Sequence, residues 1–319
     1  GITAKAVKEK CEDLQIHCVD IAAADIVISS PGIPIEELPN TNKEIISEIE
    51  FAYRLMQEQI VRPTLIGVTG TNGKTTVTSM IAHILSCPYA GNIGIPFINY
   101  VGQKHPILVV ELSSFQLELC KEFNPEIAVL LNLTPDHLDR HETMENYGEQ
   151  KFKMFKNQSI RQTIIFPENE LSIQPWVNKA RSKKRSYSLE EPLLKYWVNV
   201  RGKHALLNAS AAINVAREVG VGDDRIMEKA ETFRPLPHRL EWVNTYETRQ
   251  FINDSKATNP DATCKAVEAF DGPIHLILCG QTKGVDWCEY LRHIAKHVIS
   301  ITFFGDIAQR YFKIGRAHV

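Results

Sequence analysis

The sequence lacks the features that would place the protein in a membrane, in an oxidising compartment or on nucleic acid. No apolar run approaches the roughly 20 residues that a transmembrane helix needs. The seven cysteines are scattered without a C-x-x-C pair and their number is odd, which favours buried structural thiols in a reduced compartment. A formal net charge of −2 gives no basic footprint for nucleic acid or an anionic membrane. We therefore expect a cytoplasmic protein with neither kind of partner.

Apolar runs alternate with helical stripes along the 319 residues, which predicts an α/β protein of two or three domains. Continuous apolar runs are typical of parallel strands that are buried on both faces. We expect strands at 25–30, 64–68, 107–112, 127–132, 163–166, 250–253, 274–278 and 300–304. We expect helices at 45–56, 77–85, 204–219 and 261–270.

Two prolines, Pro235 and Pro237, interrupt this pattern and predict a linker. We divide the chain into three units at this point and before residue 61. The units are 1–60, 61–236 and 237–319. We expect the first unit to be incomplete and the third to be truncated. We also expect that segments absent from this sequence interrupt the chain, for instance near Cys87.

The rest of the sequence is organised around a glycine-rich stretch, Gly67 to Thr76, between an apolar run and a helical pattern. Strand, glycine loop and helix form the context of a phosphate-binding loop, in which backbone N–H groups and the helix N-terminus face an anion. Lys74 would neutralise phosphate charge and the Thr75 hydroxyl would bind Mg²⁺. A strict loop of this type needs glycine where the chain has Val68. The alternative is a glycine-rich turn with an exposed lysine.

Polar residues follow two of the expected strands. Glu111 ends one of them, and a carboxylate at that sheet edge suits Mg²⁺; the alternative is a solvated glutamate. Ser113 and Gln116 come next and supply hydrogen-bonding groups for a substrate. The stretch 132–141 holds two histidines and two aspartates, which could bind a metal, orient a carboxylate or simply form a polar turn.

The third unit offers two further loops that suit an anion. Residues 253–260 lie between a strand and a helix, and residues 280–284 follow the next strand. These loops suggest that the third unit holds an anionic substrate against the phosphate loop. Lys151, by contrast, has the local sequence of an ordinary surface lysine.

These stretches together resemble the Mur ligases of peptidoglycan synthesis. The resemblance covers most of the chain in order, and the family's own phosphate loop explains Val68. The matching stretches are 70–76, 91–94, 111–116, 132–139, 202–204, 238–241 and 253–259. The last of these is similar to the member that adds D-glutamate.

The resemblance implies a three-domain architecture, in which a central ATPase domain with a mostly parallel sheet lies between Rossmann-like N- and C-terminal domains. It implies an ATP-dependent ligase that joins D-glutamate to UDP-N-acetylmuramoyl-L-alanine through an acyl phosphate. It further implies ATP, two Mg²⁺ ions and a carbamylated Lys151 as cofactors, two small-molecule substrates as partners, and a monomer.

The resemblance also assigns roles to residues. Lys74, His137, Lys151 and Arg239 are expected to be catalytic. Thr75, Glu111, His137 and Lys151 are expected to bind the metal ions. ATP is expected to contact Gly70, Thr71, Asn72, Gly73, Lys74, Thr75, Thr76, Asn208, Arg239 and Asp254. The other substrates are expected to contact Asn92, Ser113, Gln116, His137, Lys256, Thr258 and Lys283.

Two rival interpretations stay open from the sequence. One is a sister ligase such as a folylpolyglutamate synthetase, from which acceptor substrates would distinguish this chain. The other is a nucleotide-binding module without catalysis, which would bind ATP without substrate-dependent release of ADP.

Overall fold

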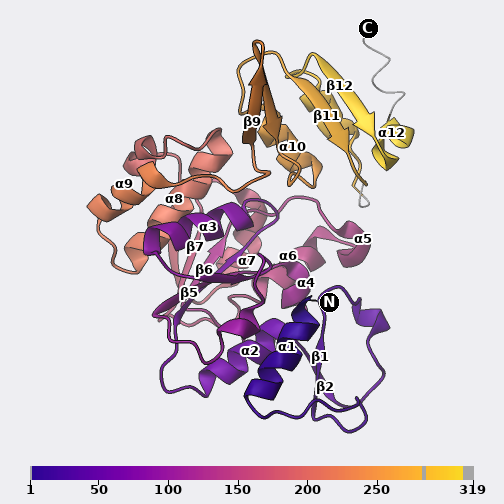
Figure 1. The fold of residues 1–319 in the computed structure, drawn as a ribbon, viewed down its shortest axis with the longest axis vertical. Helices are drawn as coiled ribbons and strands as arrows, with labels where there is room; N and C mark the ends of the chain where they lie inside the picture. Colours follow the sequence, from indigo (N-terminus) through magenta and orange to yellow (C-terminus); the bar gives the residue numbers. More distant parts are fainter. Residues whose placement is uncertain (1, 282–284, 312–319) are drawn as a thin grey trace.

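A six-stranded parallel sheet forms the middle of the computed structural model, which describes residues 2–281 and 285–311 (Figure 1). A small unit with β1 and β2 lies on one side of this sheet, and the described residues from 237 onward lie on the other (Figure 1). The architecture is therefore α/β, as the sequence predicts.

The central sheet has the strand order β4-β5-β3-β6-β7-β8, and every pair is parallel. Its strands are β3 (Thr64–Thr69), β4 (Tyr89–Gly91), β5 (Ile107–Glu111), β6 (Ile127–Leu130), β7 (Thr163–Pro167) and β8 (Lys183–Tyr187). Successive side chains point to opposite faces, so Ile66 packs into one hydrophobic core and Leu65 into the other. Burial on both faces explains the continuous apolar runs of the sequence.

Helices cover both faces of the central sheet. The core that contains Ile66 is closed by α3 (Lys74–Leu85), α8 (Lys203–Glu218) and α9 (Asp223–Thr232). The core that contains Leu65 is closed by α1, α2, α6 and α7. The bounds are α1 (Ile2–Asp13), α2 (Glu48–Gln57), α4 (Ser114–Leu117), α5 (Leu138–His141), α6 (Met144–Phe152) and α7 (Gln174–Lys179).

One predicted helix begins later than the sequence indicated. Residues 45–56 were expected to be helical throughout, but β2 (Glu44–Ser47) precedes α2. Ile45 and Ile46 pair with Val27 and Ile28 of β1 (Ile26–Ser29), a setting that β-branched side chains favour. The helix starts where the Ser47 side chain accepts a hydrogen bond from the backbone N–H of Glu50 at 3.2 Å.

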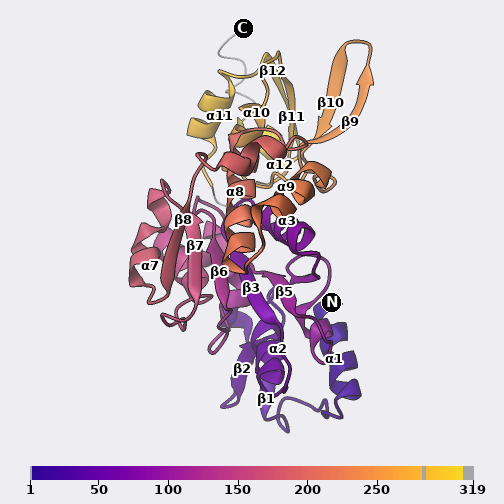
Figure 2. The ribbon, with the colours of Figure 1, turned by 90° about the vertical axis from the view of Figure 1, so that its left-hand side faces the viewer.

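The third unit contains two separate two-stranded sheets in the described part of the chain. The strands β9 (Glu241–Tyr246) and β10 (Arg249–Asn253) form an antiparallel hairpin, which projects from the molecule in Figure 2. The strands β11 (His275–Cys279) and β12 (Ser300–Phe304) are parallel. The helices are α10 (Pro260–Val267), α11 (Cys288–Ile294) and α12 (Asp306–Tyr311). No helix or strand lies between α9 and β9, which agrees with the predicted linker.

The cysteines fit the sequence-based expectation only in part. All seven are free thiols. Cys11, Cys120 and Cys264 are buried, but Cys18 and Cys279 are exposed, so the expectation of buried thiols is wrong for these two. Among the described residues, no helix has the length and apolar character needed to cross a membrane.

A buried carboxylate joins α2 to the segment that follows α4. Glu50 is fully buried and accepts hydrogen bonds from three consecutive backbone N–H groups, those of residues 121–123, at 2.9 to 3.0 Å. The Arg54 guanidinium donates to the same carboxylate at 2.9 Å. The carboxylate therefore satisfies donors that would otherwise be buried without partners.

We expect Glu50→Ala to lower the free energy of unfolding by about 3 kcal/mol, because it leaves three backbone donors without their partner and removes one of the carboxylates that pair with Arg54. Glu122→Ala is the matched control, since Glu122 also pairs with Arg54 but its side chain is 64% exposed; its loss should cost less than about 1 kcal/mol. Urea unfolding of both variants checks this. Equal losses would contradict the account.

Candidate active site

The glycine-rich loop between β3 and α3 has the tight geometry that its sequence predicts. Gly73 caps α3 with a φ of 86°, a left-handed conformation that glycine adopts without strain. A Cβ atom on Gly73 would lie 2.6 Å from the Asn208 side-chain oxygen. The predicted residue Asn208 therefore lies directly against the loop, on α8.

The stretch after β6, which contains Asn132 and Thr134, is hydrogen-bonded to this loop. The side-chain oxygen of Asn132 accepts from the backbone N–H of Asn72 at 2.8 Å, and its amide donates to the Asn72 carbonyl at 3.0 Å. The Thr71 hydroxyl donates to the Thr134 carbonyl at 3.1 Å. These bonds fix the loop backbone, which must hold its N–H groups in place for an anion.

Among the described residues, the two histidines and two aspartates of residues 132–141 do not form one group of potential metal ligands. Asp139 is exposed, whereas His141 is buried and its Nε2 lies 2.9 Å from the Ser114 hydroxyl. His137, whose backbone is left-handed with a φ of 53°, precedes both residues in the chain. The side chains of Asp136 and His137 remain at the cavity described below.

Two lysines converge on one carbonyl oxygen. Lys74 Nζ donates to the Gly70 carbonyl at 2.9 Å and to the Thr71 carbonyl at 2.7 Å. Lys151 Nζ, from α6, donates to the same Gly70 carbonyl at 2.8 Å. Lys151 is only 2% exposed, so the interpretation of Lys151 as a surface lysine is wrong.

The surroundings of Lys151 favour its uncharged form. Burial, and then the positive charge of Lys74, lower the pKa of the Lys151 amine well below its usual value, while Asp136 acts in the opposite direction. The Lys151 nitrogen lies 4.3 Å from the centre of the Tyr147 ring. The uncharged form of a lysine is a nucleophilic amine as well as a hydrogen-bond donor.

Glu111 is at the carboxyl end of β5, next to the phosphate loop, and is 1% exposed. One of its oxygens accepts from the Asn92 amide at 2.9 Å. The other oxygen is buried and has no hydrogen-bond partner among the described residues. A buried carboxylate oxygen without a donor indicates a missing partner, and a cation is the partner that suits it.

The third unit is hydrogen-bonded to the side chain of Asn72 in the phosphate loop. The Asn72 amide donates to Asp261 at 2.7 Å, and the Asn259 amide donates to the Asn72 oxygen at 2.8 Å. Asn259 also caps α10 by accepting from the backbone of Ala262 at 2.9 Å. The 253–260 stretch therefore reaches the phosphate loop, as its sequence suggested.

Arg239 and Asp254 lie close together at the start of the third unit. Burial lowers the pKa of the Arg239 guanidinium, and the carboxylates of Glu111 and Asp254 oppose that shift. Burial also raises the pKa of Asp254, against a hydrogen bond from the backbone of Leu240 at 3.0 Å. Arg239, a residue of the third unit, thus brings a positive charge near the carboxylates of Glu111 and Asp254.

Most of the predicted residues line one cavity of about 740 Å³. The predicted residues on its wall are Thr71, Asn72, Gly73, Lys74, Thr75, Asn92, Glu111, Ser113, His137, Lys151, Arg239, Lys256 and Thr258. The predicted residues that do not line it are Gly70, Thr76, Gln116, Asn208 and Asp254. Lys283 lies outside the described residues.

Gln116 has a structural contact that explains its absence from the cavity wall. Its side-chain oxygen accepts from the Ser113 backbone at 3.0 Å, while the Ser113 hydroxyl accepts from the Gln116 backbone at 3.2 Å. This reciprocal pair is a capping box at the start of α4. It fixes Ser113 at the cavity wall.

The sequence-based selection missed several residues of the cavity wall, among them Phe115, Asp136 and Tyr147. Phe115 packs between His137 and His141, with ring centres 4.8 and 5.3 Å away. Burial lowers the pKa of His141 to about 4, so this histidine is a neutral packing residue. Asp136 belongs to a stretch that the sequence had singled out, whereas no local signal indicates Tyr147.

We expect Lys74→Ala to abolish turnover of a nucleoside triphosphate without unfolding the protein, because the lost group is a charge beside a cavity and not part of a core. Lys104→Ala, at an exposed lysine far from the loop in the sequence, is the matched control and should keep full activity. Phosphate release and circular dichroism check this. Near-normal turnover in Lys74→Ala would refute the phosphate-loop assignment.

Comparison with known proteins gives consistent matches. A model of the Mur ligase middle domain matches residues 68–201. The UDP-N-acetylmuramoylalanine–D-glutamate ligase of Alkaliphilus oremlandii is 37% identical over 322 residues, which cover 90% of this chain and 70% of that protein.

Solved structures share the fold. MurF from Acinetobacter baumannii superposes with a TM-score of 0.63 at 17% identity, over 91% of this chain and 77% of that one. MurF from Thermotoga maritima, in complex with ADP, gives a TM-score of 0.62 at 16% identity, over 93% and 83% of the two chains.

Proposed function

The chain belongs to the Mur ligase family, and we propose that it is the ATP-dependent ligase that joins D-glutamate to UDP-N-acetylmuramoyl-L-alanine in peptidoglycan synthesis. The relative with 37% identity has this activity in its name. The observation that carries the proposal is that the phosphate loop, Glu111 and the cationic residues Arg239 and Lys256 all line one cavity.

The reaction takes place in two stages. The carboxylate of UDP-N-acetylmuramoyl-L-alanine attacks the γ-phosphorus of ATP, an acyl phosphate forms, and ADP leaves. The amine of D-glutamate then attacks the acyl carbon, the C–N bond forms, and inorganic phosphate and a proton leave. The protein has little covalent chemistry of its own to perform, so catalysis consists of positioning and charge stabilisation.

The phosphate loop and its neighbours bind ATP in this proposal. Backbone N–H groups of residues 70–76 face the phosphates, and Lys74 neutralises their charge. Asn208 and Asp254 contact the nucleotide from α8 and from the third unit. Arg239 stabilises the negative charge that develops on the transferred phosphoryl group.

The residues at the cavity fit Mg²⁺. The buried Glu111 oxygen without a donor is a hard ligand beside the Thr75 hydroxyl, and Mg²⁺ prefers one or two carboxylates together with phosphate oxygens. Mg²⁺ would neutralise phosphate charge when bound. Asn92 holds the Glu111 side chain in position, and Asn92 and Ser113 face the uridine-nucleotide substrate in this proposal.

A carbamylated Lys151 completes the metal ligands in this proposal, together with His137. A neutral lysine amine adds CO₂ and loses a proton, which gives an anionic carbamate with two oxygens. The buried position of Lys151 and its lowered pKa support this step. The carbamate changes a residue that would repel Mg²⁺ into one that attracts it.

The third unit supplies the site for D-glutamate. Lys256 and Thr258 line the cavity opposite the phosphate loop, and Lys283 is proposed as the second cation for the amino acid's two carboxylates. We further propose that the units 1–60, 61–236 and 237–319 are the three domains of a monomer with Rossmann-like outer domains. The free thiols of all seven cysteines support a cytoplasmic setting.

The proposal is tested by measuring release of phosphate from ATP with each amine in turn. With UDP-N-acetylmuramoyl-L-alanine present, we expect D-glutamate to be used at least about 100-fold better than L-glutamate, because fixed cations match only one arrangement of its carboxylates. No phosphate should be released without the uridine nucleotide.

Controls separate the rival functions. Equal rates with D- and L-glutamate would contradict the proposed amine. A folate that replaced the uridine nucleotide as acceptor would identify a folylpolyglutamate synthetase. ATP binding without release of phosphate in any mixture would indicate a binding module.

A further inference from the structure

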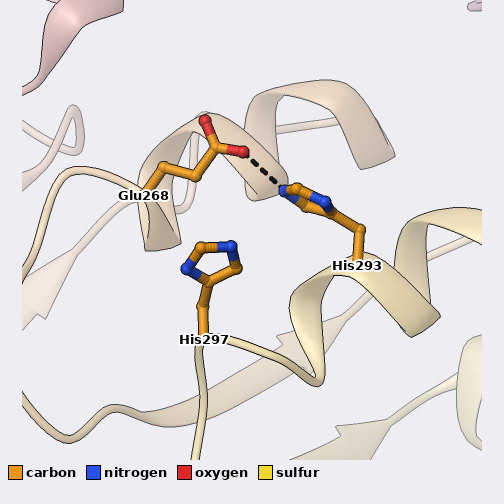
Figure 3. A group of neighbouring side chains, drawn as sticks. All are labelled: Glu268, His293 and His297. Atoms are coloured by element: carbon orange, nitrogen blue, oxygen red, sulfur yellow. Dashed lines mark hydrogen bonds and ion pairs between the residues drawn. The ribbon is translucent and has the colours of Figure 1, made fainter.

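A group of side chains with potential metal-ligand atoms lies on the third unit, outside the wall of the cavity. It consists of Glu268, His293 and His297 (Figure 3). Glu268 is the C-cap of α10, His293 is in the last turn of α11, and His297 follows that helix. None of the three lines the cavity of the proposed reaction.

The three side chains converge in space. Their potential ligand atoms all lie within 4.8 Å of one another. The His293 Nε2 lies 2.5 Å from a Glu268 oxygen, and the two imidazole rings have centres 5.0 Å apart. Figure 3 shows the His297 ring directed toward this pair. In the described chain, the His297 ring has no hydrogen bond or ion pair of its own.

We propose that Glu268, His293 and His297 form a binding site for Zn²⁺. Two imidazoles and a carboxylate are a ligand set that Zn²⁺ takes with a water as fourth ligand. The ion would replace the direct contact between the His293 Nε2 and the Glu268 carboxylate. Mg²⁺ prefers oxygen ligands in octahedral geometry, so the ion of the ATP site does not compete well here.

The helices add to the attraction for a cation. Both α10 and α11 end at this group, so the negative ends of two helix dipoles lie beside it. All three side chains are exposed or half-buried, which leaves the ion a path of entry from solvent.

A bound ion would join α10 to α11. These helices already pack through Cys264 and Leu291 in the core of the third unit. The other end of α10, roughly 12 Å away for eight helical residues, carries Asn259 and Asp261, which contact Asn72 of the phosphate loop. We infer that Zn²⁺ rigidifies the helix that holds the third unit against the loop.

Zn²⁺ affinity is to be measured on the whole chain by competition with a fluorescent chelator. A Cys18→Ser, Cys279→Ser background removes the two exposed thiols, because thiolates are themselves zinc ligands. One ion per chain is expected. Because outer partners alone change affinity by about 10–100-fold, His293→Ala, His297→Ala and Glu268→Gln should each weaken binding by more than about tenfold.

His275→Ala is the matched control, since His275 is an exposed histidine of the same unit that contacts Ser300 instead. It should bind Zn²⁺ as the background does. Zn²⁺ should also raise the melting temperature of the background protein but not that of His293→Ala. Absence of a stoichiometric ion, or equal loss of affinity in His275→Ala and His293→Ala, would overturn the proposal.

Discussion

Two lysine side chains share one backbone carbonyl oxygen of the phosphate loop, and this arrangement shapes the centre of the molecule. Lys74 and Lys151 both donate to the Gly70 carbonyl. Both lysines line the cavity, and Lys151 is only 2% exposed. Burial and the charge of Lys74 therefore lower the pKa of the Lys151 amine, which favours its uncharged form beside the phosphate loop.

The central sheet brings the rest of the site to this point. The strands β3, β5 and β6 are neighbours and parallel, so the phosphate loop, Glu111 and the bracing residue Asn132 emerge at one edge. The third unit then contacts the loop through Asn72. A site assembled from distant segments in this way can respond to the position of the third unit, and the proposed zinc site would act on the helix that makes the contact.

Features that depend on neighbouring residues could be predicted from the sequence. The glycine conformations of the loop, the strand that ends at Glu111 and the linker near Pro235 have local physical causes. The capping box of Ser113 and Gln116 was also present as a Ser-x-x-Gln pattern, and it would have separated Gln116 from the cavity residues.

Features that depend on tertiary packing could not be predicted in this way. Lys151 lies in a mostly polar stretch of the sequence, and the packing of α6 against the phosphate loop buries it. The strand at Ile45 exists because β1, far upstream, pairs with it. Glu268 and His293 are 25 positions apart, so no motif indicates that they meet.

The most direct test of the account is a ¹³C NMR measurement of the protein in ¹³C-labelled bicarbonate. If the amine of Lys151 is neutral and accessible to CO₂, the spectrum of the wild-type protein contains a carbamate carbon. This signal should be absent from Lys151→Arg, whose guanidinium keeps its charge, and present in Lys153→Arg, which changes a nearby lysine on the same segment. A wild-type spectrum without a carbamate signal, or a signal that persists in Lys151→Arg, would contradict the central role given to this lysine.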